Sequence, residues 1–326
     1  MTRVVSGQRL PLQGGLPPVE QITGAVVEIA CDESGFSGSN LLDAATPLFT
    51  HASVDLSTGE AVELIGALRS GSRYSVEELK SAKLLRGPRV GDLLSALAGR
   101  AHVHLVDKEY FLVTRIVDLL LLEPSYAAGT RLTQDDRAAA SSLYRARHAT
   151  GRDWSAFLAT FVDLVRTKRR HQPDDDVVER FFRLRDTLVM SGLGVLDGLD
   201  RDRVRDVVTR LTHDRSIPPP LEPLLPALAE TVLFWSGGER QVLVVHDEQS
   251  ALTAGRLRRL QRTLTDGAGP VCGGSPLAGL VSVDSRDDPR VQVADLLAGV
   301  ARRSPYAEDG PLQSFLSPTS LVDTEA

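Results

Sequence analysis

Four aspartates in this 326-residue sequence stand where a carboxylate is costly to place. Asp32, Asp107 and Asp247 each follow an apolar run of the kind that forms a buried strand, and Asp295 lies inside a strongly apolar helical run. Burying an unpaired carboxylate costs several kcal/mol, so acids at such positions are typical of sites where a cation offsets their charge. The alternative for an isolated Asp32-Glu33-Ser34-Gly35 is a solvated turn after a strand.

The four aspartates are expected to meet, because neighbouring strand ends in an open α/β sheet converge on one edge. A helix docked on the sheet can aim one more carboxylate at that edge. Converging carboxylates repel one another unless cations neutralise them, and hard oxygen ligands select Mg²⁺ or Mn²⁺. The sequence therefore predicts a metal site of Asp32, Asp107, Asp247 and Asp295. The alternative is that Asp295 forms a cap or an ion pair and that Asp107 is a surface turn residue.

The elements that would position these acids alternate between strands and helices. Strands are expected over 26–30, 48–55, 101–106, 241–245 and 280–283. The loop between the first two has a length that favours an antiparallel pair. Amphipathic helices are expected over 59–70, 90–97 and 291–302, with a basic one around 252–264. This order predicts the α/β class.

The middle of the chain reads differently from its flanks. From Leu112 to about Pro226 apolar residues recur at helical spacing, and no strand is expected there. We interpret 112–237 as an all-helical insertion into a core made of 21–111 and 238–305. The ends, 1–20 and 306–326, read as flexible. The insertion could also form a homodimer interface.

Composition limits the partners and the compartment. A formal net charge of −6 gives no global positive field, so binding to nucleic acid would need local patches. Two cysteines, Cys31 and Cys272, make neither a disulfide framework nor a zinc site, which fits a reducing cytoplasm. We expect no secretory signal in 1–20 and no membrane span, because no apolar run of about 18 residues occurs. The expected location is cytoplasmic.

Two basic patches are candidates for phosphate contacts. One is the compact run 166–171, which contains Arg169 and Arg170. The other is the helix after the 241–245 strand, which carries Arg256, Arg258, Arg259 and Arg262, and of these Arg256 and Arg259 are the expected contact residues. A solvated helix face is the alternative, balanced for the first patch by a neighbouring acidic run. We favour nucleic-acid contact at the second patch because it starts beside the predicted metal site. Aromatic residues make up only 5% of the chain, so base stacking is poorly provided for.

Other polar residues near the predicted site have two interpretations each. Lys83 could neutralise a phosphate or a developing oxyanion, or be a solvated side chain. His246 could act as a general acid or base, or be a hydrogen-bonded packing histidine. His102 and His104 alternate with apolar residues and share one strand face, where we interpret them as structural. Glu33 follows a predicted ligand directly, so it should point to the other face and support the site.

The order of several short motifs resembles a known family. The motifs are Asp32-Glu33-Ser34-Gly35 after a first strand, Glu78-Leu79-Lys80 with Lys83, His246-Asp247-Glu248 after a late strand, and Gln292-Val293-Ala294-Asp295-Leu296 in a last helix. Together they resemble the bacterial domain-of-unknown-function family 3800, which is similar to ribonuclease H and the wider integrase-like nuclease superfamily. The resemblance covers about residues 22–115 and 238–303.

The resemblance implies a ribonuclease H-like fold, with a five-stranded mixed sheet flanked by helices and antiparallel first strands. It also implies a metal-dependent nuclease centre built from the strand-end acids. Enzymes of the ribonuclease H type often take one acid from the first long helix. This chain offers Glu60, Glu63, Glu77 or Glu78 there, and the sequence does not choose among them.

These observations predict a Mg²⁺- or Mn²⁺-dependent phosphodiesterase acting on DNA or RNA, with water as nucleophile. Two ions about 4 Å apart, shared by Asp32 and Asp247, would clamp the attacking and leaving oxygens. The first alternative is a non-catalytic adaptor that binds nucleic acid or protein on the same sheet. The second is a phosphotransferase of the sugar-kinase and actin type. That class needs glycine-rich phosphate loops, and the stretches 236–238 and 273–275 are too isolated to serve.

Overall fold

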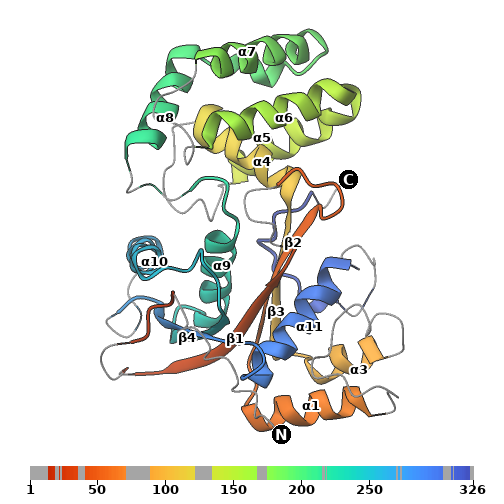
Figure 1. Cartoon of the computed structure of the whole chain (residues 1–326), viewed down its shortest axis with the longest axis vertical. Coiled ribbons are helices and arrows are strands. Elements are labelled where there is room, and N and C mark those ends of the chain that lie inside the picture. Colours follow the sequence, from red (N-terminus) through yellow and green to blue (C-terminus); the bar gives the residue numbers. More distant parts are fainter. Residues whose placement is uncertain are drawn as a thin grey trace, which may run out of the picture.

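The computed structural model describes residues 14–18, 22, 24–35, 41–70, 89–121, 134–166, 175–214, 217, 219–268, 271, 274–303, 310 and 312–323. They form a five-stranded mixed sheet with helices on both faces, so the predicted α/β class is confirmed (Figure 1). No helix within these ranges has the length and apolarity that crossing a membrane requires.

The sheet has the strand order β3-β2-β1-β4-β5. Its strands are β1 (Val26–Ser34), β2 (Leu48–Val54), β3 (Ala101–Asp107), β4 (Gln241–Asp247) and β5 (Leu277–Val283). β2 runs antiparallel to both β1 and β3, whereas β4 runs parallel to both β1 and β5. Strands β1, β3, β4 and β5 therefore all end toward the same edge. The central position of β1 fits its apolar composition on both faces.

Side-chain alternation along the strands divides the interior into two cores. The first core contains even-numbered residues of β1, such as Ala30, and lies against α1 (Thr58–Arg69), α3 (Arg89–Ala96) and α11 (Pro289–Arg303). We call this side of the sheet the α11 face.

The second core lies on the opposite side, which we call the α9 face. Odd-numbered residues of β1, such as Ile29, pack there against α9 (Leu224–Ser236) and α10 (Ala254–Ala268). Figure 1 shows α9 and α10 on one side of the strands and α1, α3 and α11 on the other.

A group of helices is stacked beyond the end of β3 (Figure 1). It consists of α4 (Lys108–Ile116), a π-helical turn (Val117–Leu121), α5 (Gln134–Arg145), α6 (Gly151–Val165), α7 (Asp175–Met190) and α8 (Arg201–His213), with short 3₁₀ turns at Ala146–Ala149 and Gly194–Gly198. Stacked rings such as Phe157 and Phe181, with centroids 4.9 Å apart, fill its interior. Its apolar interior is continuous with the core of the α9 face. α9 falls inside the predicted insertion 112–237, yet it packs on the sheet. The helical group and the α9 face therefore share one apolar core.

Both outer strands are covered by segments that the sequence marks as flexible ends. Leu16 exchanges backbone hydrogen bonds of 2.8 and 2.9 Å with Leu280 of β5. On the other side, the segment 312–323, with a 3₁₀ turn at Gln313–Phe315, runs beside β3 and bonds to it from the backbone of Ser317 and Leu321. Residues 14–18 and 312–323, which lie in the ends expected to be flexible, thus supply backbone groups that pair with the two outer strands.

Candidate functional site

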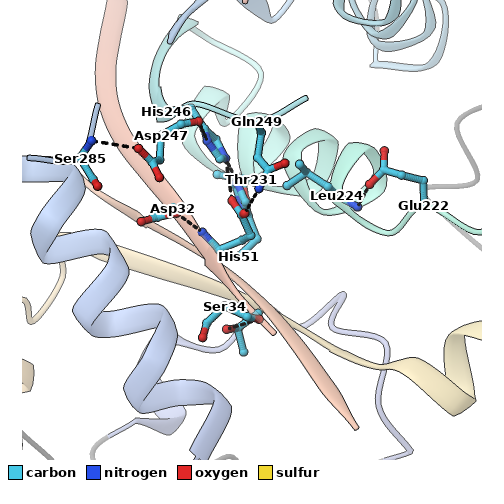
Figure 2. A network of polar contacts seen from close by, with 12 residues as sticks. Asp32, Ser34, His51, Glu222, Leu224, Thr231, His246, Asp247, Gln249 and Ser285 are labelled. Carbon is cyan, nitrogen blue, oxygen red and sulfur yellow. Dashed lines mark hydrogen bonds and ion pairs between the residues drawn. The ribbon is translucent and has the colours of Figure 1, made fainter. Parts of the chain in front are cut away.

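The central strands β1 and β4 each end in a pair of polar residues. Asp32 and Glu33 end β1, His246 and Asp247 end β4, and Cys31 lies opposite His246 in the parallel pairing. Because successive side chains on a strand point to opposite faces, each pair is split. Figure 2 shows Asp32 and Asp247 on the side of α11, with His246 turned toward α9.

Asp32 is buried, with 6% of its surface exposed. Its pKa is raised well above the usual value, first because of burial and then because the charges of Glu33, Asp295 and Asp247 oppose its ionisation. The backbone N–H of Glu33 donates to Asp32 Oδ1 at 2.7 Å and partly offsets this. Two of the other predicted metal ligands, Asp247 and Asp295, thus lie within electrostatic reach of Asp32.

Asp247 is held by the loop that follows β5. The backbone N–H of Ser285 donates to Asp247 Oδ1 at 2.9 Å, and Figure 2 shows this contact beside α11. The pKa of Asp247 is raised, mainly by burial, while the hydrogen bond from Ser285 lowers it and the charge of Asp284 raises it. The turn between β5 and α11 therefore closes over this acid.

Two polar contacts fix α11 alongside β1, and with it Asp295. Near the start of the helix Arg290 pairs with Glu28, and near its end Arg302 Nε donates to Ser34 Oγ at 3.0 Å. The two contacts span about 20 Å of strand and about 18 Å of helix, so strand and helix run side by side at matching lengths. Asp295 lies between these two contacts along α11, and its charge acts on Asp32.

The α9 face carries a chain of neutral histidines instead of acids. His51 of β2 contacts Thr231 of α9 through Nδ1 at 2.9 Å and His246 through Nε2 at 3.3 Å. His246 Nδ1 lies 2.8 Å from the carbonyl oxygen of Asp247. Burial lowers the pKa of His51 well below its usual value and that of His246 to about 4, so both rings are neutral at pH 7.

Because both rings are neutral, each has one donor and one acceptor nitrogen, so all the hydrogen bonds of this histidine chain run in one donor-to-acceptor direction. His246 Nδ1–H must donate to the Asp247 carbonyl, which leaves His246 Nε2 as an acceptor. His51 Nε2–H then donates to it, and His51 Nδ1 accepts from the hydroxyl of Thr231. The chain is fully paired from Thr231 to Asp247, and it ties α9 to the end of β4.

Glu33 is the one carboxyl at these strand ends that faces α9. Gln249 Nε2 donates to its Oε1, while Oε2 is buried without a hydrogen-bond partner, 3.8 Å from His246 Nε2. Burial raises the pKa of Glu33 from 4.5 to about 7; the bond from Gln249 lowers it, and the charges of Asp247 and Glu222 raise it further. Glu33 is therefore a buried acid with one unpartnered oxygen, beside His246 of the hydrogen-bonded histidine chain.

The structure does not bring Asp107 to this cluster, which corrects its predicted role. In the sheet register Asp107 lies opposite Leu48 of β2, whereas Asp32 lies opposite Ala52. Four strand residues amount to about 13 Å, and two strand spacings separate β3 from β1 in addition. Its carboxylate instead accepts two backbone N–H groups of the first turn of α4, at 2.8 and 3.0 Å, and the Tyr144 hydroxyl at 2.7 Å. Asp107 is the N-cap of that helix.

Several residues of the predicted site lie outside the described residues. They are Lys83, Arg169, Arg170, Glu77 and Glu78. Of the two remaining acids of the first long helix, Glu60 forms a capping box with Ser57 and an ion pair with Arg100 at 2.6 Å, and Glu63 is exposed. Both lie near the start of α1, which follows the end of β2 and so stands at the opposite edge of the sheet.

The other predicted nucleic-acid residues and the strand histidines lie on the α9 face. Arg256 Nη1 donates to the carbonyl of Ala251 at 3.0 Å, and Arg259 is half-buried on α10. His102 and His104 share this face, as their alternation predicts. His102 stacks on Phe234 of α9 at 4.0 Å between ring centroids. Burial lowers the pKa of His102 to about 4 and that of His104 to about 3, so both are neutral.

Within the described ranges, no three His, Cys, Asp or Glu side chains are arranged to hold a metal ion. The chemistry of the acids nevertheless suits a hard divalent cation. The side chains of Asp32, Asp247 and Asp295 offer only oxygen atoms, which are the ligands that such a cation prefers. A cation among them would relieve the repulsion that raises the pKa of Asp32.

His51 and Thr231 were missed by the reading of the sequence. No local pattern marks either residue, since each stands in an apolar run and gains its partner only through tertiary packing. No protein-family model, curated protein or solved structure matches this chain. The function must therefore be argued from the chemistry of the strand-end acids themselves.

Proposed function

We propose that the protein is a metal-dependent phosphodiesterase that hydrolyses nucleic acid. The observation that supports this most is the buried Asp32 at the centre of the sheet, whose ionisation is opposed by Asp295 and Asp247. Three acids from two strands and a helix, gathered at one edge, are expensive for a fold that makes no use of them. Mg²⁺ or Mn²⁺ is the cofactor that their oxygen atoms would select.

The proposal includes a ribonuclease H-like architecture for the sheet and its flanking helices. It is supported by the antiparallel β1–β2 and β2–β3 pairs, by the parallel β1–β4 and β4–β5 pairs, and by an acid on the helix that follows the last strand. Of these features, the antiparallel first strands and an acid in the last helix belong to the resemblance to family 3800. The helices between β3 and β4 would then be an elaboration of that core.

Each acid has a distinct task in this proposal. Asp32 and Asp247, from adjacent parallel strands, would hold the cation between them, and Asp295 would complete the site from the helix above. When bound, the cation activates the attacking water and stabilises the leaving oxygen of the phosphodiester. Ser285 keeps Asp247 oriented through its backbone N–H. The contacts of Arg290 and Arg302 with β1 hold α11 at the height where Asp295 can reach the acids.

The test is cleavage of labelled single-stranded, duplex and hybrid oligonucleotides in Mn²⁺ or Mg²⁺. We expect cleavage of at least one substrate, and its loss in the Asp32→Asn variant and in EDTA. Asp92→Asn is the matched control, because Asp92 is an exposed aspartate of α3. Cleavage that persists in Asp32→Asn, or no cleavage of any substrate, would overturn the proposal. In the second case the non-catalytic adaptor becomes the better explanation.

A further inference from the structure

The exposed side of α10 presents two arginines in register. The helix buries Leu257, Leu260 and Leu264, and positions 258 and 262 lie outside this buried face. Residues four apart on a helix are neighbours on one face. Arg258 and Arg262 therefore stand side by side, both exposed to solvent.

Both arginines line a cleft of about 560 Å³ between α10 and β5. Its walls are fixed by hydrogen bonds among themselves. Gln241 Nε2 donates to the Ser275 carbonyl at 2.8 Å, and the Ser275 hydroxyl donates to the Gln261 carbonyl at 3.0 Å. These donors are already used, so the two guanidinium groups are the strongest donors that face the cleft.

The pairing of these arginines differs from that of other arginines on the surface. Arg145, Arg201 and Arg290 each pair with a carboxylate within 2.7 Å. Within the described part of the chain, neither Arg258 nor Arg262 forms an ion pair. Asp266, the one acid among the lining residues, leaves the cleft with a net positive charge. In a protein of net charge −6, such a cleft is selective for an anion.

We infer that this cleft binds the phosphate backbone of the polynucleotide that the strand-end acids cleave, at a distance from the scissile bond. The two places lie at opposite ends of β4, because Gln241 at its start lines the cleft and Asp247 at its end is one of the acids. Six strand residues span about 20 Å, and the cleft lies on the α9 face while the acids lie on the α11 face. A polynucleotide that reaches both places therefore has to pass around the edge of the sheet, and it needs more than the roughly six phosphates per strand that a straight duplex has over about 20 Å. The inference rests on the proposed function for its substrate class. Within the four-arginine patch that the sequence marks, it assigns the contact to Arg258 and Arg262, which are exposed and line the cleft, and not to the expected Arg256 and Arg259, which are half-buried.

The test measures binding without cleavage, as a function of salt, in EDTA. For an Arg258→Gln/Arg262→Gln variant we expect the slope of log K against log salt to fall by about 1 per arginine lost. At about 0.1 M salt, binding should weaken by about tenfold per arginine. The matched control is Arg201→Gln/Arg205→Gln, which removes the same charge from α8, where both arginines contact Glu179. Melting temperatures verify that both variants fold.

Three outcomes would overturn the inference. They are an unchanged slope in the α10 variant, an equal loss in the α8 control, and displacement of the oligonucleotide by equimolar inorganic phosphate or mononucleotide, which would indicate a small-ligand site. Failure of the proposed function would give a different result from failure of this inference. If the wild-type protein binds through Arg258 and Arg262 but cleaves nothing with Mn²⁺ present, the inference holds and the hydrolase is lost.

Discussion

The two faces of the sheet carry polar residues at the same edge but satisfy them in opposite ways. On the α9 face His51 and His246 are buried, neutral and joined into one hydrogen-bonded chain from Thr231 to the carbonyl of Asp247. On the α11 face Asp32 and Asp247 are also in an apolar setting, yet their charges oppose each other. Burial moves every one of these pKa values toward the neutral form, upward for acids and downward for histidines.

This difference in hydrogen-bond pairing distinguishes a structural network on the α9 face from a candidate binding site on the α11 face. A buried polar chain whose donors and acceptors are all matched rigidifies a core and needs no ligand. A buried acid such as Asp32, whose pKa is raised by burial and by neighbouring acids, keeps a cost that a proton or a cation removes. Both arrangements grow from the same two dipeptides, Asp32-Glu33 and His246-Asp247, because alternation sends neighbouring residues to different faces.

The largest expected difference between the two faces comes from substituting two adjacent residues of β4, one on each face. We expect Asp247→Asn to reduce cleavage by about 10²–10³, the scale on which removing one charge-stabilising group acts. His246→Gln, one residue earlier but on the other face, should lose stability and keep cleavage within tenfold. Rates measured under single-turnover conditions decide it. Equal losses in both variants would instead make His246 a general acid or base of the reaction.

The pH dependence of stability tests the acid that faces α9. The folded protein holds the Glu33 proton up to a pKa of about 7, against 4.5 for the ordinary group. Between these values the unfolded chain releases its proton first, so this group makes the folded state less stable as pH rises. The loss amounts to on the order of 3 kcal/mol.

Glu33→Gln should remove that loss. Urea unfolding in EDTA at pH 5 and pH 8 should show the variant gaining stability relative to wild type at pH 8 only. The charge of Glu33 also raises the pKa of Asp32, so its removal eases the ionisation of Asp32 and adds to the gain of the variant at high pH. A difference between variant and wild type that does not change with pH would show that Glu33 is not a buried acid of raised pKa.

Titration with Mn²⁺ tests whether the acids of the α11 face, and not the histidines of the α9 face, bind the metal. Ligand at 100 times its Kd stabilises a protein by about 2.7 kcal/mol, which raises the melting temperature. We expect Mn²⁺ to raise the melting temperature of wild type and of Thr231→Val, and to leave that of Asp32→Asn unchanged. A rise of equal size in Asp32→Asn would place the ion elsewhere.

The smallest expected effect concerns the closed network. Thr231→Val removes the hydroxyl that donates to His51 Nδ1 and leaves that nitrogen buried without a donor. The cost should be about 1–3 kcal/mol in unfolding free energy, with cleavage unchanged. Chemical denaturation of the variant and of Thr187→Val, an exposed helical threonine, provides the measurement and its control. A cleavage defect in Thr231→Val would mean that the two faces are coupled.

The parts of this fold that the sequence predicts are those with local signals. Five apolar runs predict the five strands, because a strand buried on both faces has to be apolar over its length. The approach of Asp32, Asp247 and Asp295 also follows from the chain, since parallel strands end at one edge and the last helix crosses it.

Where the prediction failed, one local signal had two meanings. Asp107 follows a buried strand like the other acids, but a helix begins at the next residue, and an aspartate directly before a helix is a strong N-cap. His51 acquires its role only when α9 supplies Thr231 from 180 residues away. No periodicity encodes such a meeting, so the histidine chain could not be predicted.

The coverage of both outer strands has a consequence for how molecules meet in solution. An exposed strand edge is a template on which another chain can add a strand, and this is a common route to aggregation. Here the backbone groups of Val103 and Leu105 are already bonded to Ser317 and Leu321, and those of Leu280 to Leu16. A protein truncated before residue 312 would expose the edge of β3, on which a second molecule could add a strand. The segment 312–323 therefore blocks this edge against pairing with other molecules.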